Sequence, residues 1–388
     1  MYSKDDLNAL FRKIAANIDI SDEMFDAAEK EYTDLGKWID DETPDYKISI
    51  FPQGSFGLGT VIKPISNEDD YDLDIVCQFA KDYGLSAKEL KVDVVKPLLV
   101  RYRKSSKGIV NKRCCWHVDY DDIPQFHMDI IPSFLVPSGK FIYITEHNEE
   151  TDTYEYIGSN PSGYIKWFFD RCAKQRERLY QNYVKEHRMV VMQADIEKVK
   201  RRKVKTPLQR VVQLLKRHRD IMFADDNSEN KPVSIIITTM AATLYEEEDN
   251  IVDAMTKILT TAPKWIHDNM KDGEYFIENP SYAGENFANK WNVHPERATA
   301  FFKWLKQATD DLTSDNLYNY SRIALGNHIK RIFGEKTGKD VFSSIAEKER
   351  AEITSGAKKI DPSSGNLSKA GSIVVPVTHH YGDVTAGV

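Results

Sequence analysis

Residues 53–60 read Gln-Gly-Ser-Phe-Gly-Leu-Gly-Thr, and the motif Asp72-Leu73-Asp74 follows inside an apolar run. In a strand, side chains at i and i+2 point to the same face, so Asp72 and Asp74 are expected to stand side by side, with Cα atoms roughly 6.5 Å apart. Gly54 lets the backbone approach a phosphate closely, and Ser55 offers an N–H and a hydroxyl donor. The stretch therefore predicts a phosphate-binding turn placed before a paired-carboxylate metal site.

A third carboxylate is expected from a neighbouring strand. Asp129 lies in the apolar run 128–131, where an unpaired carboxylate would be costly. Magnesium prefers hard oxygen ligands and keeps several waters, so these Asp side chains are enough to hold two ions for phosphoryl or nucleotidyl transfer. The alternative is that Asp72 and Asp74 lie on the solvent side of a half-buried strand, because alternating polar and apolar residues are what any such strand shows.

The composition is that of a soluble globular protein. The chain has 388 residues, of which 41% are apolar and 29% charged, with a net charge of -7. No secretory signal is recognisable, and the longest apolar stretch, at 235–244, is too short to span a bilayer. The four cysteines form no Cys-x-x-Cys pair, which argues against a structural zinc site. We therefore expect a cytoplasmic protein with no membrane partner.

Sequence periodicity divides the chain into four segments. Residues 1–45 predict helices that pack on the body, with Ser3 and Ser21 as N-caps. Residues 46–205 predict an α/β domain with connecting helices, which would be the domain that carries out nucleotidyl transfer. Its strands are expected at 48–51, 60–62, 73–76, 115–118 and 126–131. Residues 206–350 predict a helical lobe, and 351–388 a flexible C-terminal tail. The expected fold class is α+β, a mixed β-sheet core followed by a helical C-terminal lobe.

With these motifs the chain resembles the polymerase-β-type nucleotidyltransferases. The residues that carry the resemblance are 53–60, Asp72-Leu73-Asp74 and His127-Met128-Asp129. A narrower resemblance is to the bacterial enzymes related to cGAS and to the dinucleotide cyclase of Vibrio (CD-NTases), which make cyclic oligonucleotide signals in anti-phage defence. It rests on the stretches 208–219, 234–238 and 279–291.

This resemblance implies a two-lobed enzyme whose active site lies between a sheet and a helical lobe. Gln53, Gly54 and Ser55 would bind the donor triphosphate. Asp72, Asp74 and Asp129 would hold two Mg²⁺ ions, with Mn²⁺ as an alternative, and Asp129 would help to deprotonate the acceptor hydroxyl. Attack on the donor α-phosphate expels pyrophosphate, and a second cycle closes a cyclic di- or trinucleotide made from ATP, with GTP as a further substrate. The product would act on a downstream effector.

Two residues of the helical lobe have competing interpretations. Lys216 either reaches the β and γ phosphates of the donor as a point charge or is a solvated residue near a helix end. Ser234 is either a phosphate ligand or a plain N-cap for the helix that follows it.

Two further segments suggest partners. The basic run 198–205 predicts either a nucleic-acid activator site or a solvated charged loop, and the absence of interleaved aromatic residues favours the loop. Some relatives join their C-terminus to a target through a ubiquitin-ligase-like E1/E2 enzyme. A trimmed end at Gly382 or Gly387 would allow this here.

Other functions share the same metal site. They are a linear oligonucleotide synthetase and a nucleotidyltransferase that acts on RNA. A catalytically silent nucleotide-binding scaffold is a third alternative, but a silent protein has no need to keep three like charges together. The sequence does not specify base identity, linkage or ring size.

Overall fold

The computed structural model describes residues 2–66, 71–105, 107–120, 126–187, 204–225, 230–363, 365 and 367–375. It consists of two compact units, Met1–Ser321 and Arg322–Val388. In the second unit, α14 (Arg322–Phe333) is followed by α15 (Glu335–Thr354), which runs past the boundary predicted at residue 350. A small antiparallel sheet of β8 (Lys359–Ile360) and β9 (Leu367–Ser368) lies within the predicted tail. The boundaries predicted at 45 and 205 remain predictions.

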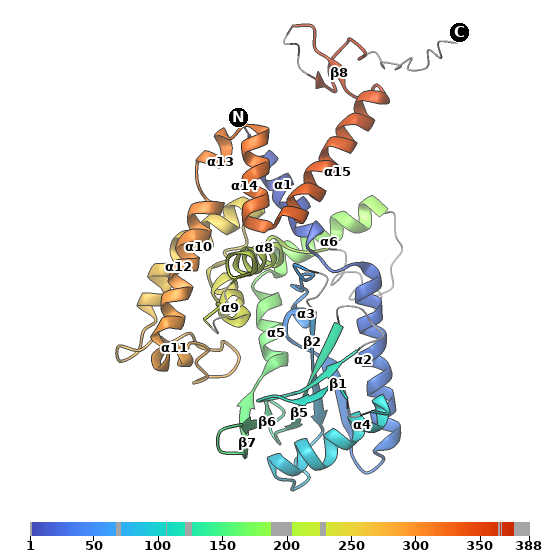
Figure 1. Cartoon of the computed structure of the whole chain (residues 1–388), viewed down its shortest axis with the longest axis vertical. Coiled ribbons are helices and arrows are strands. Elements are labelled where there is room, and N and C mark those ends of the chain that lie inside the picture. Colours follow the sequence, from blue (N-terminus) through green and yellow to red (C-terminus); the bar gives the residue numbers. More distant parts are fainter. Residues whose placement is uncertain are drawn as a thin grey trace, which may run out of the picture. The chain divides into compact units, whose positions relative to one another are not determined.

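The first unit is built around a mixed sheet, which in the described residues has seven strands (Figure 1). The strands are β1 (Ile48–Pro52), β2 (Tyr71–Phe79), β3 (Ile109–Asn111), β4 (Trp116–Asp119), β5 (Phe126–Leu135), β6 (Ile142–Asn148) and β7 (Thr153–Ser159). Their order is β1-β2-β5-β4-β3, with β6 paired to β5 and β7 to β6. β2 and β5 are parallel, and the other pairs are antiparallel. The predicted α+β class is confirmed.

One face of this sheet is covered by helices. α1 (Lys4–Asn17) and α2 (Asp22–Glu42) have the predicted caps: Ser3 forms a capping box, and Ser21 Oγ accepts the N–H of Met24. α2 packs on the sheet together with a seven-residue π-helix, η1 (Glu89–Val95), and α4 (Lys96–Arg103). The side chains between them form one hydrophobic core with the inward residues of β2, β4 and β5. The opposite face of the same strands is therefore left for polar side chains.

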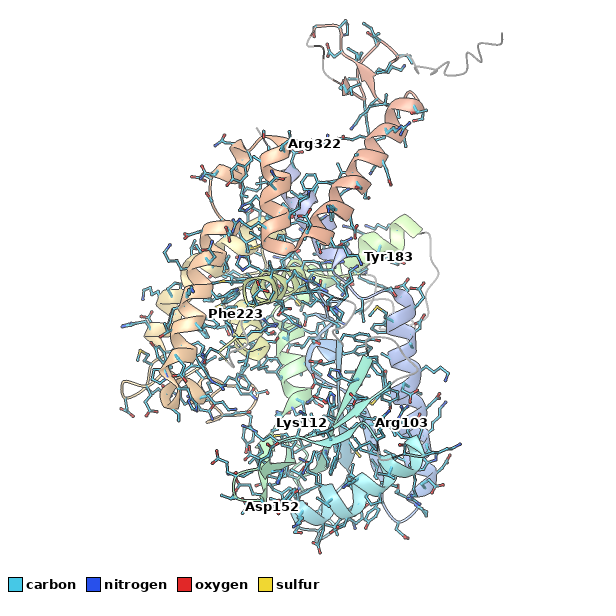
Figure 2. The ribbon with its side chains drawn as sticks, in the orientation of Figure 1. Arg103, Lys112, Asp152, Tyr183, Phe223 and Arg322 are labelled. Atoms are coloured by element: carbon cyan, nitrogen blue, oxygen red, sulfur yellow. The ribbon has the colours of Figure 1, made fainter. Side chains whose placement is uncertain are left out.

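The rest of the first unit is helical, as the sequence predicts. Its helices are α3 (Gly54–Leu58), α5 (Pro161–Asp170), α6 (Ala173–His187), α8 (Pro207–Met222), α9 (Ser234–Leu244), α10 (Ile251–Asp268), α11 (Asn289–Val293), α12 (Pro295–Leu312) and α13 (Asn316–Asn319). α8 and α9 are buried along most of their length. In Figure 2, Arg103 and Lys112 mark the sheet half of this unit, and Phe223, just after α8, marks its helical half. No described helix is long and apolar enough to cross a membrane.

The strand predicted at 60–62 is wrong. This segment belongs to no strand, and carbonyl oxygens of residues 58–63 accept hydrogen bonds from side chains of α8 instead of from a neighbouring strand. The donors are Gln209 to Leu58 (2.9 Å), Gln213 to Val61 (2.8 Å), Lys216 to Thr60 (3.2 Å) and Arg217 to Lys63. Side chains of a helix therefore provide the hydrogen bonds that these backbone carbonyls would otherwise accept from a neighbouring strand.

Candidate active site

The sheet face opposite the hydrophobic core carries the three predicted carboxylates. Asp74 on β2 is in register with Asp129 on the parallel strand β5. Asp72 lies two residues earlier on β2, and the residue between the two, Leu73, is completely buried on the core side. The structure thus brings Asp72, Asp74 and Asp129 to one face of two adjacent strands.

A neighbouring strand adds residues that the sequence analysis missed. On β4, His117 is in register with Asp129, and Asp119 is in register with His127 of β5. His127 in turn faces Asp72 on β2. Three adjacent strands therefore carry the same pattern, an Asp or His followed two residues later by Asp. This repetition of the pattern is the sequence signal that could have revealed His117 and Asp119.

Hydrogen bonds connect the imidazoles to the carboxylates. His127 Nε2 lies 2.7 Å from Asp72 Oδ1. His117 Nδ1 lies 2.8 Å from Asp129 Oδ1, and its Nε2 lies 3.0 Å from Asp119 Oδ1. The two imidazole rings are neighbours, with centroids 4.3 Å apart. Each of the carboxylates Asp72 and Asp129 is thus held by one histidine.

The two carboxylates of β2 have opposite pKa shifts. Burial, together with the charges of Asp72 and Asp129, raises the pKa of Asp74 from 3.8 to about 7. Burial also acts to raise the pKa of Asp72, but the hydrogen bond from His127 and nearby positive charges outweigh it, so this pKa is lowered overall. A divalent cation bound beside Asp74 would offset both its burial and the two neighbouring negative charges.

The donor set fits such a cation. Clustered carboxylate oxygens are the ligands that Mg²⁺ and Mn²⁺ prefer. Among the described residues, His117, His127 and Asp129 also offer ligand atoms that all lie within 4.8 Å of one another.

Gly54 packs directly against Asp74. The predicted Gly-Ser turn is in fact the first turn of α3, where Gly54 has a φ of +54°. A Cβ at this position would lie 2.1 Å from Asp74 Oδ2. The N–H of Gln53, just before the helix, donates to the carbonyl of Asp74 (2.8 Å). Gly54 is therefore required by the close approach of the backbone to Asp74, whereas the sequence analysis expected a close approach to phosphate.

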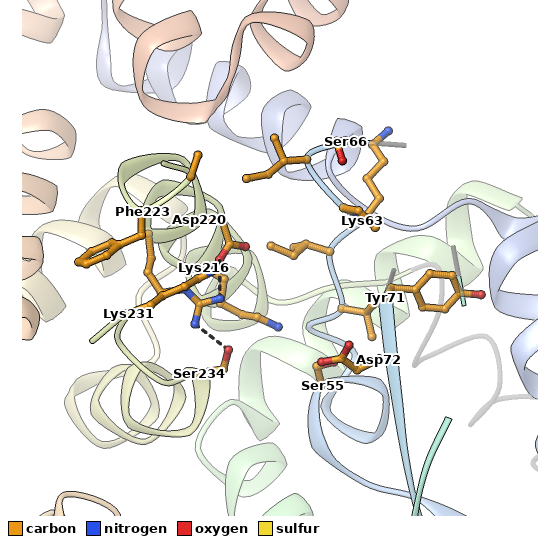
Figure 3. A pocket seen from close by; sticks show the side chains of 16 residues that line it. Ser55, Lys63, Ser66, Tyr71, Asp72, Lys216, Asp220, Phe223, Lys231 and Ser234 are labelled. Atoms are coloured by element: carbon orange, nitrogen blue, oxygen red, sulfur yellow. Dashed lines mark hydrogen bonds and ion pairs between the residues drawn. The ribbon is translucent and has the colours of Figure 1, made fainter. Parts of the chain in front are cut away.

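A cavity of about 620 Å³ opens beside this face. Ser55 and Asp72 line it from the sheet side, and Lys216, Lys231 and Ser234 line it from the helical side (Figure 3). Lys216 is only 7% exposed, so the interpretation as a solvated helix end is wrong. Burial, and then the charge of Arg219, lower the pKa of Lys216 to about 8. The cavity thus places a buried ammonium opposite a carboxylate.

Ser234 is not the N-cap of its helix. The N-cap position of α9 is occupied by Val233, and Ser234 is the first helical residue. Its hydroxyl accepts a hydrogen bond from Arg219 Nη1 (2.8 Å). Arg219 and Lys231 also pair with Asp220, each at 2.7 Å. These cationic residues of the cavity were not among the predicted site residues.

Comparison with known proteins identifies relatives over most of the chain. Residues 6–171 match the family model described as "Second Messenger Oligonucleotide or Dinucleotide Synthetase domain". The chain is 30% identical over 312 residues to a c-di-GMP synthase of Roseivirga ehrenbergii, an alignment that covers 78% of each protein.

Two solved structures share the fold. CdnG of Bradyrhizobium diazoefficiens in complex with GTP has a TM-score of 0.69 at 21% identity, over 88% of this chain and 99% of that one. The GTP-bound form of DncV from Vibrio cholerae has a TM-score of 0.51 at 17% identity, over 84% of this chain and 79% of that one. The chain therefore belongs to the second messenger oligonucleotide or dinucleotide synthetase family, the cGAS- and DncV-like nucleotidyltransferases that make cyclic oligonucleotide signals.

Proposed function

We propose that this chain joins purine nucleoside triphosphates, GTP among them, into a cyclic dinucleotide at the face formed by Asp72, Asp74 and Asp129. The observation that carries this proposal is the register of Asp74 with Asp129 next to Asp72, beside a cavity that also contains Ser55 and Lys216. Attack by a 3′- or 2′-hydroxyl on the donor α-phosphate forms one phosphodiester bond and releases pyrophosphate. Repeating the step within the linear intermediate closes the ring.

In this proposal the three carboxylates hold two Mg²⁺ ions, for which Mn²⁺ can substitute. When bound, the ions neutralise phosphate charge and lower the pKa of the attacking hydroxyl. Asp129 accepts the proton of that hydroxyl, and its neighbour Asp74 keeps the local potential negative, which attracts the cations. The raised pKa of Asp74 supports a cation at this face, because two ionised carboxylates in register repel each other.

The donor triphosphate is proposed to lie along the cavity of about 620 Å³. Ser55 donates to it from the sheet side through its hydroxyl, with the backbone of Gln53 and Gly54 beside it. Lys216 and Ser234 contact it from the helical side. Lys216 now donates to the carbonyl of Thr60, and its long flexible stem allows the ammonium to turn toward a phosphate instead.

A second cavity, of about 710 Å³, supports a guanine base in at least one nucleotide. It shares Lys231 with the first cavity and is lined by Arg113, Glu285 and the aromatic residues Tyr282, Phe287 and Trp291. An Arg guanidinium donates well to guanine O6 and N7, a carboxylate accepts from guanine N1–H and the exocyclic amine, and aromatic rings stack on bases. In this proposal the motif at 279–291 binds the base, which agrees with the activity of the Roseivirga relative, a c-di-GMP synthase.

Product analysis tests this function. The purified protein is incubated with single NTPs and pairwise mixtures, with Mg²⁺ or Mn²⁺, and products are identified by mass and by resistance to phosphatase. A phosphatase-resistant dinucleotide from GTP or a GTP mixture is expected. A phosphatase-sensitive product would favour the linear synthetase, incorporation only onto RNA would favour the RNA-directed enzyme, and no turnover would favour the silent scaffold. The variant Asp72→Asn with Asp74→Asn is expected to be inactive but folded.

We place the enzyme in the cytoplasm, where its NTP substrates are, in anti-phage signalling through an effector that binds the product. The tail at 376–388 and residues 198–203 of the basic run lie outside the described residues, so the E1/E2 partner and the nucleic-acid activator stay predictions. Intact-mass analysis of tail truncations with the partner enzyme tests the former. Lys205 at the end of the basic run is buried in an ion pair with Asp19, which removes it from such a surface.

A further inference from the structure

We infer that His117, supported by Asp119, is a positioning residue that holds Asp129 for metal binding and hydroxyl deprotonation. This inference rests on the proposed function of the carboxylate face. It assigns a role to two residues of β4, and its basis is the geometry of their hydrogen bonds.

The orientation of the Asp129 side chain has to be fixed by a neighbouring residue. It is in register with Asp74, and Asp72 lies on the same face, so its carboxylate faces two like charges at close range. Without a partner, the side chain would gain by rotating away from them. His117 prevents this because its Nδ1 bonds to Asp129 Oδ1 at 2.8 Å. Within the described residues no hydrogen bond is made to Oδ2, so that oxygen stays available for a metal ion or a hydroxyl proton.

His117 is itself held from its other side. Its Nε2 lies 3.0 Å from Asp119 Oδ1. The backbone of Asp119 is fixed in turn, because its N–H donates to the carbonyl of Gly108 (2.9 Å) and its carbonyl accepts from Arg103 Nη2 (3.2 Å). The imidazole therefore spans two carboxylates whose strands are hydrogen-bonded neighbours, which leaves it little freedom to swing. Partners of this kind behind a metal ligand are commonly worth about 10–100-fold in metal affinity or activity.

Two amide substitutions separate the two bonds of His117. The side-chain nitrogen of Asn reaches the position of Nδ1, and that of Gln reaches the position of Nε2. His117→Asn thus keeps a donor for Asp129 and loses the contact with Asp119. His117→Gln keeps a donor for Asp119 and loses the contact with Asp129. If His117 only filled space at this half-buried position, Asn and Gln would replace it equally well.

The experiment measures Mn²⁺ affinity by the electron paramagnetic resonance signal of the free ion, and kcat and KM for GTP with Mg²⁺, in full-length protein. His117→Gln and His117→Ala are expected to weaken Mn²⁺ binding and lower kcat by about 10–100-fold with little change in KM. His117→Asn is expected to lose only a few-fold, and so is Asp119→Ala. The double variant His117→Asn with Asp119→Ala should be no worse than His117→Asn, because the two changes remove the same contact.

Circular dichroism melts establish that each variant is folded. Equal losses in His117→Asn and His117→Gln, or a wild-type Mn²⁺ affinity and kcat in His117→Ala, would overturn the positioning role. If the wild-type protein makes no cyclic product, the proposed function fails, while the Mn²⁺ affinities of the same variants still decide the role of His117.

Discussion

The substitution Asp74→Asn is expected to abolish catalysis and at the same time to stabilise the metal-free protein. In the unfolded chain this carboxyl ionises near pH 3.8, and in the folded chain near pH 7. The folded state therefore binds its proton more tightly, so Asp74 lowers the free energy of unfolding as the pH rises from about 4 to about 7 and by a constant amount above that. A shift of about three pKa units corresponds to about 4 kcal/mol. Solvent reaches part of this side chain, which makes that figure an upper limit.

Urea unfolding in EDTA measures this effect. At pH 8 the Asp74→Asn variant is expected to exceed the wild type by about 1–4 kcal/mol in the free energy of unfolding, and the gain should disappear near pH 4. Added Mg²⁺ or Mn²⁺ should stabilise the wild type more than the variant. In the wild type a bound ion offsets the repulsion between the Asp74 carboxylate and its acidic neighbours, and the variant lacks that carboxylate. Turnover of NTPs by the variant, measured in parallel, should be undetectable.

Asp72→Asn is the matched control, because this residue lies two positions away on the same face and its pKa is shifted in the opposite direction. A lowered pKa contributes stability above the unfolded pKa of 3.8, and that contribution is lost as the pH falls through the folded value. The carboxylate is 63% exposed and paired with His127. Its neutralisation should therefore give a small loss of stability at pH 8. If both Asn variants moved the free energy of unfolding in the same direction, our electrostatic description of this face would be refuted.

Four other substitutions test the surroundings of the site, with Gly84→Ala as the control for Gly54→Ala. Gly54→Ala should reduce initial rates of NTP turnover by roughly 100-fold, since its Cβ would lie 2.1 Å from a site carboxylate. Gly84→Ala, at a φ of +78° with no atom within 4 Å of the new Cβ, should cost only about 1–2 kcal/mol in urea unfolding and retain turnover. Gln213→Met should cost about 1–3 kcal/mol in the same assay, because it removes the side-chain donor to the carbonyl of Val61 and one of the donors to the Asp19 carboxylate. Lys216→Met should raise KM for NTPs more than it lowers kcat, and an unchanged KM would argue against phosphate contact.

Local signals in the sequence were sufficient for part of this structure. The Ser3 capping box and the period-2 alternation around Asp72 depend only on neighbouring residues, and both are present in the structure. The placement of Asp129 beside Asp74 could be predicted as well, because an acidic residue in an apolar strand needs a partner. These features follow from short-range geometry and from the cost of burying charge.

Features that depend on strand register or on distant partners could not be predicted. The residues at 60–62 have the composition of a strand, but their carbonyls are satisfied by α8, which lies about 150 positions later in the chain. The repeated pattern of Asp or His followed two residues later by Asp pointed to His117, but its position opposite Asp129 follows only from the pairing of β4 with β5. Strands β6 and β7 were also missed, although residues 142–145 and 153–157 are rich in the β-branched and aromatic residues typical of strands.

Helix α8 connects the two sides of the cavity of about 620 Å³. Gln209, Gln213 and Lys216 are spaced four and three residues apart, so they lie on one face of the helix. All three donate to the backbone of the segment at 58–61, which directly follows α3 and its Ser55. The helix that presents Lys216 to the cavity therefore also fixes the segment behind Ser55. The groups proposed to bind phosphate from the two sides of the cavity are thus positioned by a single helix, so the loss of Gln213 should weaken NTP binding even though its side chain does not line the cavity.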